Sequence, residues 1–510
     1  MAVGPVLHQT VVSLLATASS TTRCWRCSVE TWTMDADPFI SWAAQDLSLT
    51  RTWDKTSASD VAISHLPSGR RVTFGDLEGM TALTATELHA QTELHGLARP
   101  VVVYETYDEV TTLVGILASA RVGLSTCLIR PGTWSASSKR LSAELETAGF
   151  DGVLYDGALI VRSQRVSSTP AATHLFLQSG GTTGQPRLIR MDLSPPALSG
   201  MLRLYRQAGW RTGLRQLIMM PMYHAAGLLS ALIGVLDGHQ LIVAGTLSDS
   251  EKLLAAIGAE SIEWFCATPT HLRLLAFSEG FESARLDSVR GVLHTGAACD
   301  HETKRRWLDL LGGDRVHEFY SSTEQVGLTF CSGREWAERP GTVGRGYLTR
   351  ISVRDPAGRP VPTGMVGEVY MRSLAHARNA APGVRRTNDG SCSVGDRGYL
   401  DADGYLFLVG REGDMFTVGG ENVYPLELER AILEVPGVRD AMVRPRSHRV
   451  LGSIAEALVI ADKPTKSTAL AIKAHCRRSL PPASRPYALS FVAALPRTEV
   501  GKLRRWDLDG

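Results

Sequence analysis

The stretch Gln178-Ser-Gly-Gly-Thr-Thr-Gly-Gln-Pro-Arg187 places three glycines and three hydroxyl side chains in one short polar segment. It follows the apolar run His174-Leu-Phe-Leu, which predicts the end of a strand. Glycines let backbone N–H groups close on phosphate oxygens, and the hydroxyls and Arg187 add donors and positive charge. The common P-loop ends in Gly-Lys-Ser/Thr, whereas Pro-Arg follows here. The stretch therefore predicts a phosphate-binding loop of another kind, with a Gly-rich surface turn as the alternative.

Around this loop, strand-like and helix-like segments alternate along the chain. Short apolar runs predict strands at residues 101–104, 125–129, 216–220, 240–244 and 261–266. Helical spacing of apolar residues predicts helices at residues 106–121, 228–236 and 251–259. This order predicts an α/β fold in which helices pack on largely parallel sheets.

The pattern changes after Arg345, where short strands separated by Gly, Pro and Asp turns predict a small β-rich subdomain. From Arg411 a compact tail begins, with predicted helices from residue 425 and at residues 470–480 and a strand at 457–460. We therefore expect a large domain over residues 34–411 and a small mobile α+β domain over residues 412–510. Residues 1–33 differ from the rest and are expected to be a disordered extension or the product of an upstream start codon.

Composition excludes several classes of protein. At 510 residues the chain is too long for one core, and 44% apolar with 21% charged residues is typical of a soluble globular protein. A net charge of +2 does not favour a nucleic-acid partner, and no apolar run has the length of a membrane-spanning helix. The eight cysteines lie mostly in apolar segments, which indicates reduced thiols and a cytoplasmic location.

Three further clusters carry chemistry. Glu318-Phe-Tyr-Ser-Ser-Thr-Glu324 combines an aromatic ring that can stack on a base with a carboxylate that can hold Mg²⁺. Asp396 is suited to bidentate contact with two ribose hydroxyls, whereas Asp401-Ala-Asp-Gly404 is interpreted as a β-turn. Lys502, in Val-Gly-Lys502-Leu, stands near the C-terminus and by itself is typical of a solvated basic tail.

In combination, these four clusters resemble the signature motifs of the adenylate-forming superfamily of acyl- and aryl-CoA synthetases, aryl-acid ligases and adenylation domains. The resemblance extends from about residue 50 to the C-terminus. The form of the loop at Ser179–Gly184 is similar to that of aryl-acid-activating members, and Gly419-Gly-Glu-Asn-Val-Tyr-Pro425 is similar to that of CoA ligases. The resemblance implies a large adenylate-forming α/β domain with packed sheets and a small C-terminal lid domain.

The resemblance also implies roles for individual residues. The residues expected to bind ATP or AMP are Gly180, Gly181, Thr182, Thr183, Gly184, Arg187, Glu318, Phe319, Tyr320, Ser321, Asp396 and Arg411. Those expected to act in catalysis are Lys502, Thr323 and His224, with Glu324 holding Mg²⁺. Those expected to line the acyl pocket are His224, Thr295, Gly296, Ala297 and Val326, and those on the coenzyme A side are Gly419, Gly420 and Glu421. For His224, a core histidine is the alternative.

Within this set, Tyr320 covers the adenine, Asp396 and Arg411 bind the ribose, and Lys502 bridges the acid carboxylate and the α-phosphate. The chain departs from the family pattern at several positions. Arg187 stands where Lys is usual, Ser321 where Gly is usual, and Gly413 where Asp or Lys is usual. Arginine keeps the charge of lysine but changes its donor geometry.

The expected function is activation of a small organic carboxylic acid by ATP and transfer to coenzyme A. Three alternatives stay open: loading of an acyl carrier protein, a specialist for the thioester-forming half-reaction, and a non-catalytic binding protein on the same fold. The expected acid is aryl, cyclic or medium-chain, because Ala297 and Ala298 are small. A homodimer is a further expectation.

Overall fold

The computed structural model describes residues 56–155, 158–162, 174–178, 187–191, 193–245, 249–373, 384–449, 451–498 and 503–505. All of these residues belong to one compact unit, Pro38–Gly510. The extension predicted over residues 1–33 falls outside the described residues.

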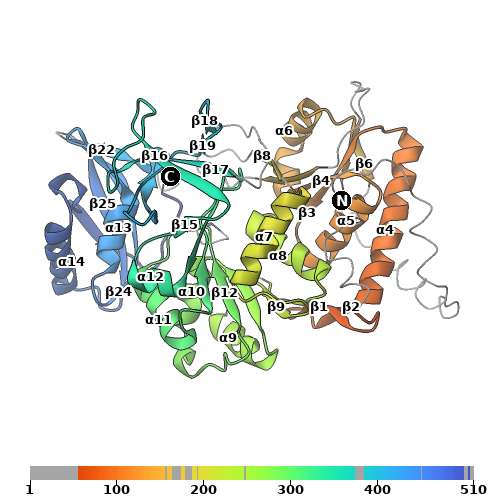
Figure 1. The fold of residues 1–510 in the computed structure, drawn as a ribbon, viewed down its shortest axis with the longest axis horizontal. Helices are drawn as coiled ribbons and strands as arrows, with labels where there is room; N and C mark the ends of the chain where they lie inside the picture. Colours follow the sequence, from red (N-terminus) through yellow and green to blue (C-terminus); the bar gives the residue numbers. More distant parts are fainter. Residues whose placement is uncertain are drawn as a thin grey trace. The chain divides into compact units, whose positions relative to one another are not determined.

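The larger of two sheets that carry the fold has nine strands among the described residues (Figure 1). Their spatial order is β15 (Arg345–Gly346), β14 (Thr329–Ser332), β13 (Val316–Glu318), β12 (Gly291–His294), β11 (Trp264–Ala267), β9 (Arg215–Ile218), β10 (Gln240–Val243), β1 (Val61–His65) and β2 (Arg70–Thr73). The strands from β13 to β1 are parallel, whereas β14, β15 and β2 are antiparallel. The parallel strands therefore bring their carboxyl ends to one edge.

A second sheet holds the strands that flank the glycine-rich stretch. Its order in the described part of the chain is β6 (Ala158–Arg162), β5 (Gly152–Tyr155), β3 (Pro100–Glu105), β4 (Ser125–Ile129), β7 (Leu175–Gln178) and β8 (Leu188–Met191). β7 and β8 are antiparallel, with Gln178 opposite Leu188. Residues 179–186 connect these two strands and lie outside the described residues.

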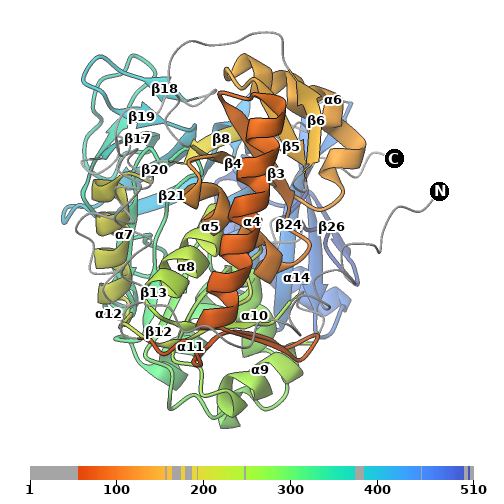
Figure 2. The same cartoon turned by 90° about the vertical axis from the view of Figure 1, so that its right-hand side faces the viewer.

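Helices cover both sheets, and α4 and α5 lie side by side in Figure 2. The helices of this part are α4 (Phe74–His95), α5 (Glu109–Arg121), α6 (Thr133–Thr147), α7 (Pro195–Gln207) and α8 (Ala225–Leu236). α8 buries every residue from Gly227 to Val235, as expected for a helix that is apolar on all sides. Leu228 of α8, Leu128 of the six-stranded sheet and Leu293 of the nine-stranded sheet share one core.

A second core packs on the other face of the nine-stranded sheet. It lies beneath α9 (Ser250–Ala259), α10 (Pro269–Ala276), the short η2 (Phe281–Ser283) and α11 (His301–Leu311). Because side chains alternate across a strand, Val292 joins this core while Leu293 joins the first. The helix α12 (Gly333–Glu338) follows β14.

The β-rich subdomain predicted after Arg345 is confirmed. Its strands among the described residues are β16 (Thr349–Arg354), β17 (Gly367–Ser373), β18 (Arg385–Arg386), β19 (Cys392–Ser393), β20 (Asp396–Leu400) and β21 (Leu406–Arg411). The predicted turn at Asp401–Gly404 is also confirmed, since the Gly404 N–H donates to the Asp401 carbonyl.

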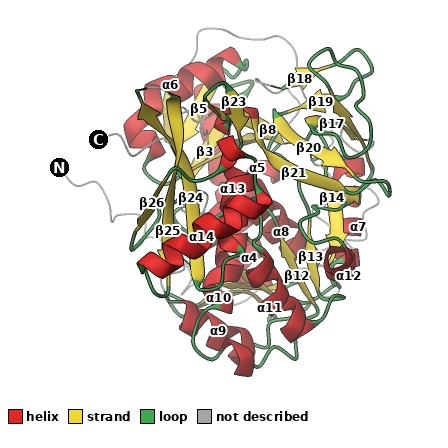
Figure 3. Cartoon of the chain, turned by 90° about the vertical axis from the view of Figure 1, so that its left-hand side faces the viewer, coloured by secondary structure: helices red, strands yellow, loops and turns green. Residues whose placement is uncertain are grey.

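The tail folds around its own core beneath a three-stranded sheet (Figure 3). Its elements are η3 (Glu412–Asp414), β22 (Phe416–Val418), β23 (Glu421–Val423), α13 (Pro425–Leu433), β24 (Val438–His448), β25 (Gly452–Ala461), α14 (Lys466–Ser479), η4 (Pro482–Ser484) and β26 (Ala488–Phe491). In the described part of the chain, no helix is long and apolar enough to cross a membrane.

One predicted strand starts later than expected, and one long helix was not predicted. The strand expected from residue 261 starts at Trp264, because Ser261 has a positive φ of 50° and turns the chain. The helix α4 was not predicted, because its apolar residues do not form one stripe. The α/β fold itself is confirmed.

Candidate functional site

Some of the predicted site residues lie where parallel strands of the nine-stranded sheet end. Ala267, His294 and Glu318 are neighbours at the ends of β11, β12 and β13. Beyond these ends, the Thr295 N–H donates to the Ala267 carbonyl at 3.1 Å and the Phe319 N–H to the His294 carbonyl at 3.1 Å. Thr295 and Phe319 therefore begin adjacent loops, which places the predicted acyl-pocket segment beside the predicted adenine segment.

His224 lies at the same edge of the sheet, after β9. It is the residue before α8, and its N–H donates to the Pro221 carbonyl. Its ring lies 4.5 Å from that of Tyr223, and its side chain is half-buried. A Cβ added at Gly227 would lie 2.5 Å from the Pro221 oxygen, so this tight turn requires glycine. His224 is thus neither sealed in the core nor remote from the site.

Tyr320, Asp396 and Arg411 meet in one charged cluster, here called the Asp396 cluster. Asp396 and Arg411 are opposite each other on the antiparallel strands β20 and β21, and Arg411 Nε lies 2.6 Å from Asp396 Oδ1. The Tyr320 hydroxyl donates to Asp396 Oδ2. Since a carboxylate has about four lone-pair sites, Asp396 keeps acceptor capacity for a ligand's hydroxyls.

Electrostatics in this cluster act on Arg411 and Tyr320. The carboxylate raises the pKa of Arg411 above its ordinary value, despite partial burial. Burial and the neighbouring Asp396 raise the pKa of Tyr320 well above its ordinary value, so its hydroxyl keeps its proton. A protonated phenol and a guanidinium thus orient one carboxylate beside a partly buried ring.

The segment from Ser321 to Leu328 is a closed reversal. Ser321 and Leu328 pair as an isolated bridge, and Ser321 Oγ donates to the Gly327 carbonyl at 2.8 Å. Ser321, which replaces the usual glycine, therefore has a structural contact of its own. Thr323 and Glu324 lie half-buried within this reversal. Val326 packs with Tyr320 on the core of the β-rich subdomain.

Two predicted nucleotide-binding side chains are engaged elsewhere. Glu318 is 5% exposed, and Lys304 Nζ lies 2.7 Å from its Oε2. Phe319 is buried in the core between the two sheets. Their backbone atoms alone are left to line a nucleotide site.

Gly419 and Gly420 form the two-residue turn between β22 and β23, with φ values of 58° and 90°. This hairpin turn needs positive φ at both positions, which glycine tolerates. Glu421 starts β23 and is exposed. The geometry explains the glycines by the turn, and their contact with coenzyme A stays a prediction.

Part of the predicted set falls outside the described residues: Gly180, Gly181, Thr182, Thr183, Gly184 and Lys502. Arg187 is described; it is exposed and directly precedes β8. A magnesium ion commonly takes one or two carboxylates plus phosphate oxygens, which fits Glu324 beside a nucleotide site.

Two clusters in the described residues were not predicted. One is the buried group of His294, Lys304 and Glu318. The other is an ion-pair network that joins Arg273 and Asp300 to Asp440 and Arg497. Helical charged residues are usually solvated, so no local pattern marked either cluster.

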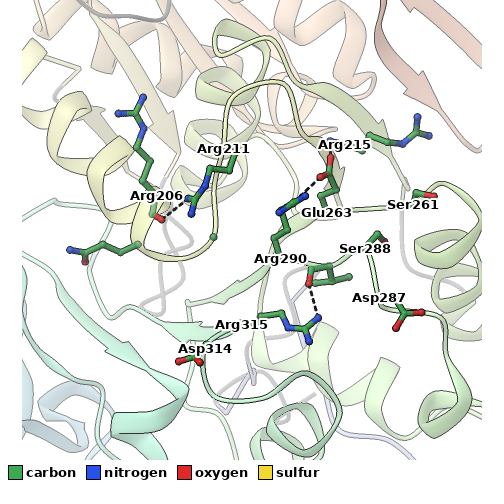
Figure 4. A pocket seen from close by; sticks show the side chains of 13 residues that line it. Arg206, Arg211, Arg215, Ser261, Glu263, Asp287, Ser288, Arg290, Asp314 and Arg315 are labelled. Carbon is green, nitrogen blue, oxygen red and sulfur yellow. Dashed lines mark hydrogen bonds and ion pairs between the residues drawn. The ribbon is translucent and has the colours of Figure 1, made fainter.

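A cavity of about 690 Å³ lies at the opposite edge of the nine-stranded sheet (Figure 4). Arginines before or at the amino ends of β9, β12 and β13 line it, namely Arg215, Arg290 and Arg315. Arg290 pairs with Glu263 at 2.9 Å and Arg215 with Glu260 at 2.8 Å. None of the predicted site residues that the structure describes lines this cavity, so it is not the candidate active site.

Comparison with known proteins identifies the family of this chain. The family description "AMP-binding enzyme" matches residues 80–379, and "AMP-binding enzyme C-terminal domain" matches residues 427–502. A sulfoacetate–CoA ligase of Cupriavidus necator is 28% identical over 399 residues, covering 74% of this chain and 77% of its own length. A 2-succinylbenzoate–CoA ligase of Bacillus licheniformis is 28% identical, covering 66% of this chain and 70% of its own.

Solved structures share the fold. The anthranilate CoA ligase AuaEII, in complex with anthranoyl-AMP, has a TM-score of 0.72 at 19% identity, covering 93% of this chain and 96% of its own. The amide bond synthetase McbA from Marinactinospora thermotolerans has a TM-score of 0.69 at 23% identity, covering 89% and 97%. The family match spans more than half of the chain. The chain therefore belongs to the AMP-binding, adenylate-forming enzymes, and it is an AMP-forming acid–thiol ligase that uses ATP, Mg²⁺ and coenzyme A.

Proposed function

We propose that this enzyme activates a small aryl, cyclic or medium-chain carboxylic acid as its acyl-adenylate and transfers the acyl group to coenzyme A. The observation that carries the proposal is the meeting of Tyr320, Asp396 and Arg411, separated by up to 91 positions in the sequence, beside the loop that starts at Thr295. We also propose that the boundary between the large domain and the small C-terminal domain lies at Arg411-Glu-Gly413.

The Asp396 cluster serves the nucleoside. The Tyr320 ring offers a face for adenine, and the remaining lone pairs of Asp396 accept the ribose hydroxyls. Arg411 holds Asp396 in place through its hydrogen bond to Oδ1. Arg187 follows the glycine-rich stretch, where its guanidinium supplies charge to the outer phosphates.

The acid end is assigned to the segment Thr295–Ala297 and to His224. Gly296 has a φ of 93°, and the small Ala297 leaves room for a ring or a branched acyl group. In the first step a carboxylate oxygen attacks the α-phosphorus and pyrophosphate leaves. In the second step the thiol sulfur attacks the carbonyl carbon, the thiol proton is released and AMP leaves.

Like charges approach each other in the first step, so positive charge must stand near the reacting atoms. Glu324 would hold the Mg²⁺ that neutralises phosphate charge, and Lys502 would bridge the carboxylate and the α-phosphate. Thr323, in the same reversal as Glu324, would donate to the α-phosphate. The roles of Glu324 and Thr323 rest on the position of the segment Tyr320–Gln325 at the site edge, and the role of Lys502 rests on the resemblance to the family.

The test is a panel of aryl, cyclic and straight-chain acids, with AMP release measured with coenzyme A, with a phosphopantetheinylated carrier protein, and without either. We expect AMP to accumulate when an acid and coenzyme A are both present. Release only with the carrier protein would favour the carrier-loading alternative. Thioester formation from synthetic adenylates, without acid-dependent ATP–pyrophosphate exchange, would favour the half-reaction specialist.

A further inference from the structure

Lys304 of α11 is a fully buried lysine at the ends of two site strands. It is 0% exposed, and its Nζ lies 2.6 Å from His294 Nε2 and 2.7 Å from Glu318 Oε2. The same ammonium lies 5.4 Å from the centre of the Trp336 ring. Removing one partner of a buried ion pair leaves an uncompensated charge, so this arrangement is held tightly.

The two partners of Lys304 stand at matching positions of adjacent strands. His294 is the last residue of β12 and Glu318 the last residue of β13, and the two are paired in the parallel register. The next residues in the chain begin the Thr295–Ala297 loop and the Phe319–Ser321 segment. The Lys304 side chain therefore contacts the residue that directly precedes each of the two loops.

Lys304 lies on the side of the nine-stranded sheet that α11 covers. Along β12 and β13, His294 and Glu318 alternate with Leu293 and Phe319, which belong to the core between the sheets. The residues Val292 and Val316, on the same strand face as His294 and Glu318, belong to the core beneath α11. Lys304 thus contacts the strand-end residues His294 and Glu318, which directly precede the two loops, from the side of α11.

His294 stays neutral in this group. Burial and the adjacent Lys304 hold its pKa well below its ordinary value. Its Nε2 therefore accepts from the ammonium, and Lys304 and Glu318 balance each other in charge. The cluster therefore has no net charge, and hydrogen bonds hold its three side chains together.

We propose that Lys304 is a positioning residue of the adenylate site, which fixes the spacing between the acyl-pocket loop and the adenine segment. This inference rests on the proposed function. A displacement of about 1 Å in a site can cost roughly 100-fold in rate. Loss of the Lys304 contacts would therefore lower the reaction rate in addition to any effect on folding.

The principal test is the double variant Lys304→Met/Glu318→Gln, which leaves no unpaired charge and keeps an amide near His294. We expect kcat/KM for adenylation to fall about 100-fold, with the KM values for ATP and for the acid both raised. Binding of a non-hydrolysable ATP analogue is measured by calorimetry on the same preparations.

Asp237→Asn is the matched control. Asp237 is 1% exposed and accepts from Trp210 Nε1 at 2.8 Å, but it precedes β10 at the opposite edge of the same sheet. We expect this variant to lose thermal stability while its kcat/KM at 25 °C stays within about twofold of wild type.

An unchanged kcat/KM in the double variant, or a loss no larger than that of Asp237→Asn at equal melting temperature, would overturn the inference. If the double variant does not fold, Lys304→Arg, which keeps the positive charge and changes only the donor geometry, is read in its place, with at least a threefold rise in the KM for ATP expected and an unchanged KM contradicting the inference. Wild-type enzyme that binds no ATP analogue would contradict the proposed function instead.

Discussion

Two aspartates of this molecule have similar surroundings and different positions. Asp396 accepts from Tyr320 and Arg411, and Asp440 accepts from Arg273 at 2.8 Å and Arg497 at 2.5 Å. Both carboxylates are mostly covered. The first lies within the β-rich subdomain next to the site, whereas the second joins the tail to α10.

The difference lies in what each cluster fixes. Asp396 and Arg411 sit on neighbouring strands, so the pair orients a binding group. Arg273 also pairs with Asp300 at 3.0 Å, and Arg497 donates to Thr270 at 3.5 Å. The Asp440 network therefore ties the tail segment around Arg497 to the carboxyl edge of the sheet, where Thr270 follows β11.

The largest expected effect is that of removing the Lys502 side chain. Lys502→Ala should reduce adenylate formation about 100- to 1,000-fold, because it removes a cation at the forming acyl–phosphate bond. Thioester formation from a synthetic acyl-adenylate should continue. Each half-reaction is followed separately, and equal losses in both would contradict the assigned role.

The next effect separates the two aspartates directly. Asp396→Asn should lower kcat/KM for ATP by roughly 10- to 100-fold, because hydrogen bonds to charged groups contribute about 1.5–3 kcal/mol each. The KM for the acid should change much less. Asp440→Asn is the matched variant, and an equal rise in its KM for ATP would show that the two clusters are not distinct in function.

A third variant tests the proposed hinge at Gly413, between the large domain and the tail. Gly413 lies in η3, and a Cβ there would meet no atom within 4 Å, so Gly413→Ala is a suitable control. Gly413→Pro restricts φ at this position and disfavours the helical conformation of Glu412. We expect adenylation to persist and thioester formation to fall about 10-fold, since the second step needs the tail to rotate. An unchanged ratio of the two rates would place the hinge elsewhere.

The resemblance to the adenylate-forming family assigned Tyr320, Asp396 and Arg411 to one nucleotide site, because each stands in a motif of that family. It did not predict Lys304, which is flanked in α11 by charged residues that are typical of a solvated face. The burial of Lys304 depends on His294 and Glu318, which are 10 and 14 residues away. Arg273 and Asp440 are 167 residues apart, so only the packing of the tail reveals their contact.

Asp440→Asn is expected to have the smallest effect and to act on the balance of the two half-reactions. Arg497 and Leu503 pair as an isolated bridge, and Lys502 is the residue before Leu503 in the sequence. The Asp440 network therefore holds the tail residue Arg497 against Arg273 and Thr270, and we expect adenylation to depend on this arrangement of the tail. Charge-assisted hydrogen bonds between partly exposed groups are modest, so adenylation should fall only about threefold.

Thioester formation from a synthetic adenylate should stay unchanged or rise slightly in the same variant. Added salt should reproduce part of the effect in the wild type, because these side chains are 14–24% exposed and are open to partial screening. Asp462→Asn is the control, since Asp462 pairs with Arg439 within the tail itself. If both variants changed the ratio of the half-reactions equally, the contact between Asp440 and α10 would have no part in placing the tail.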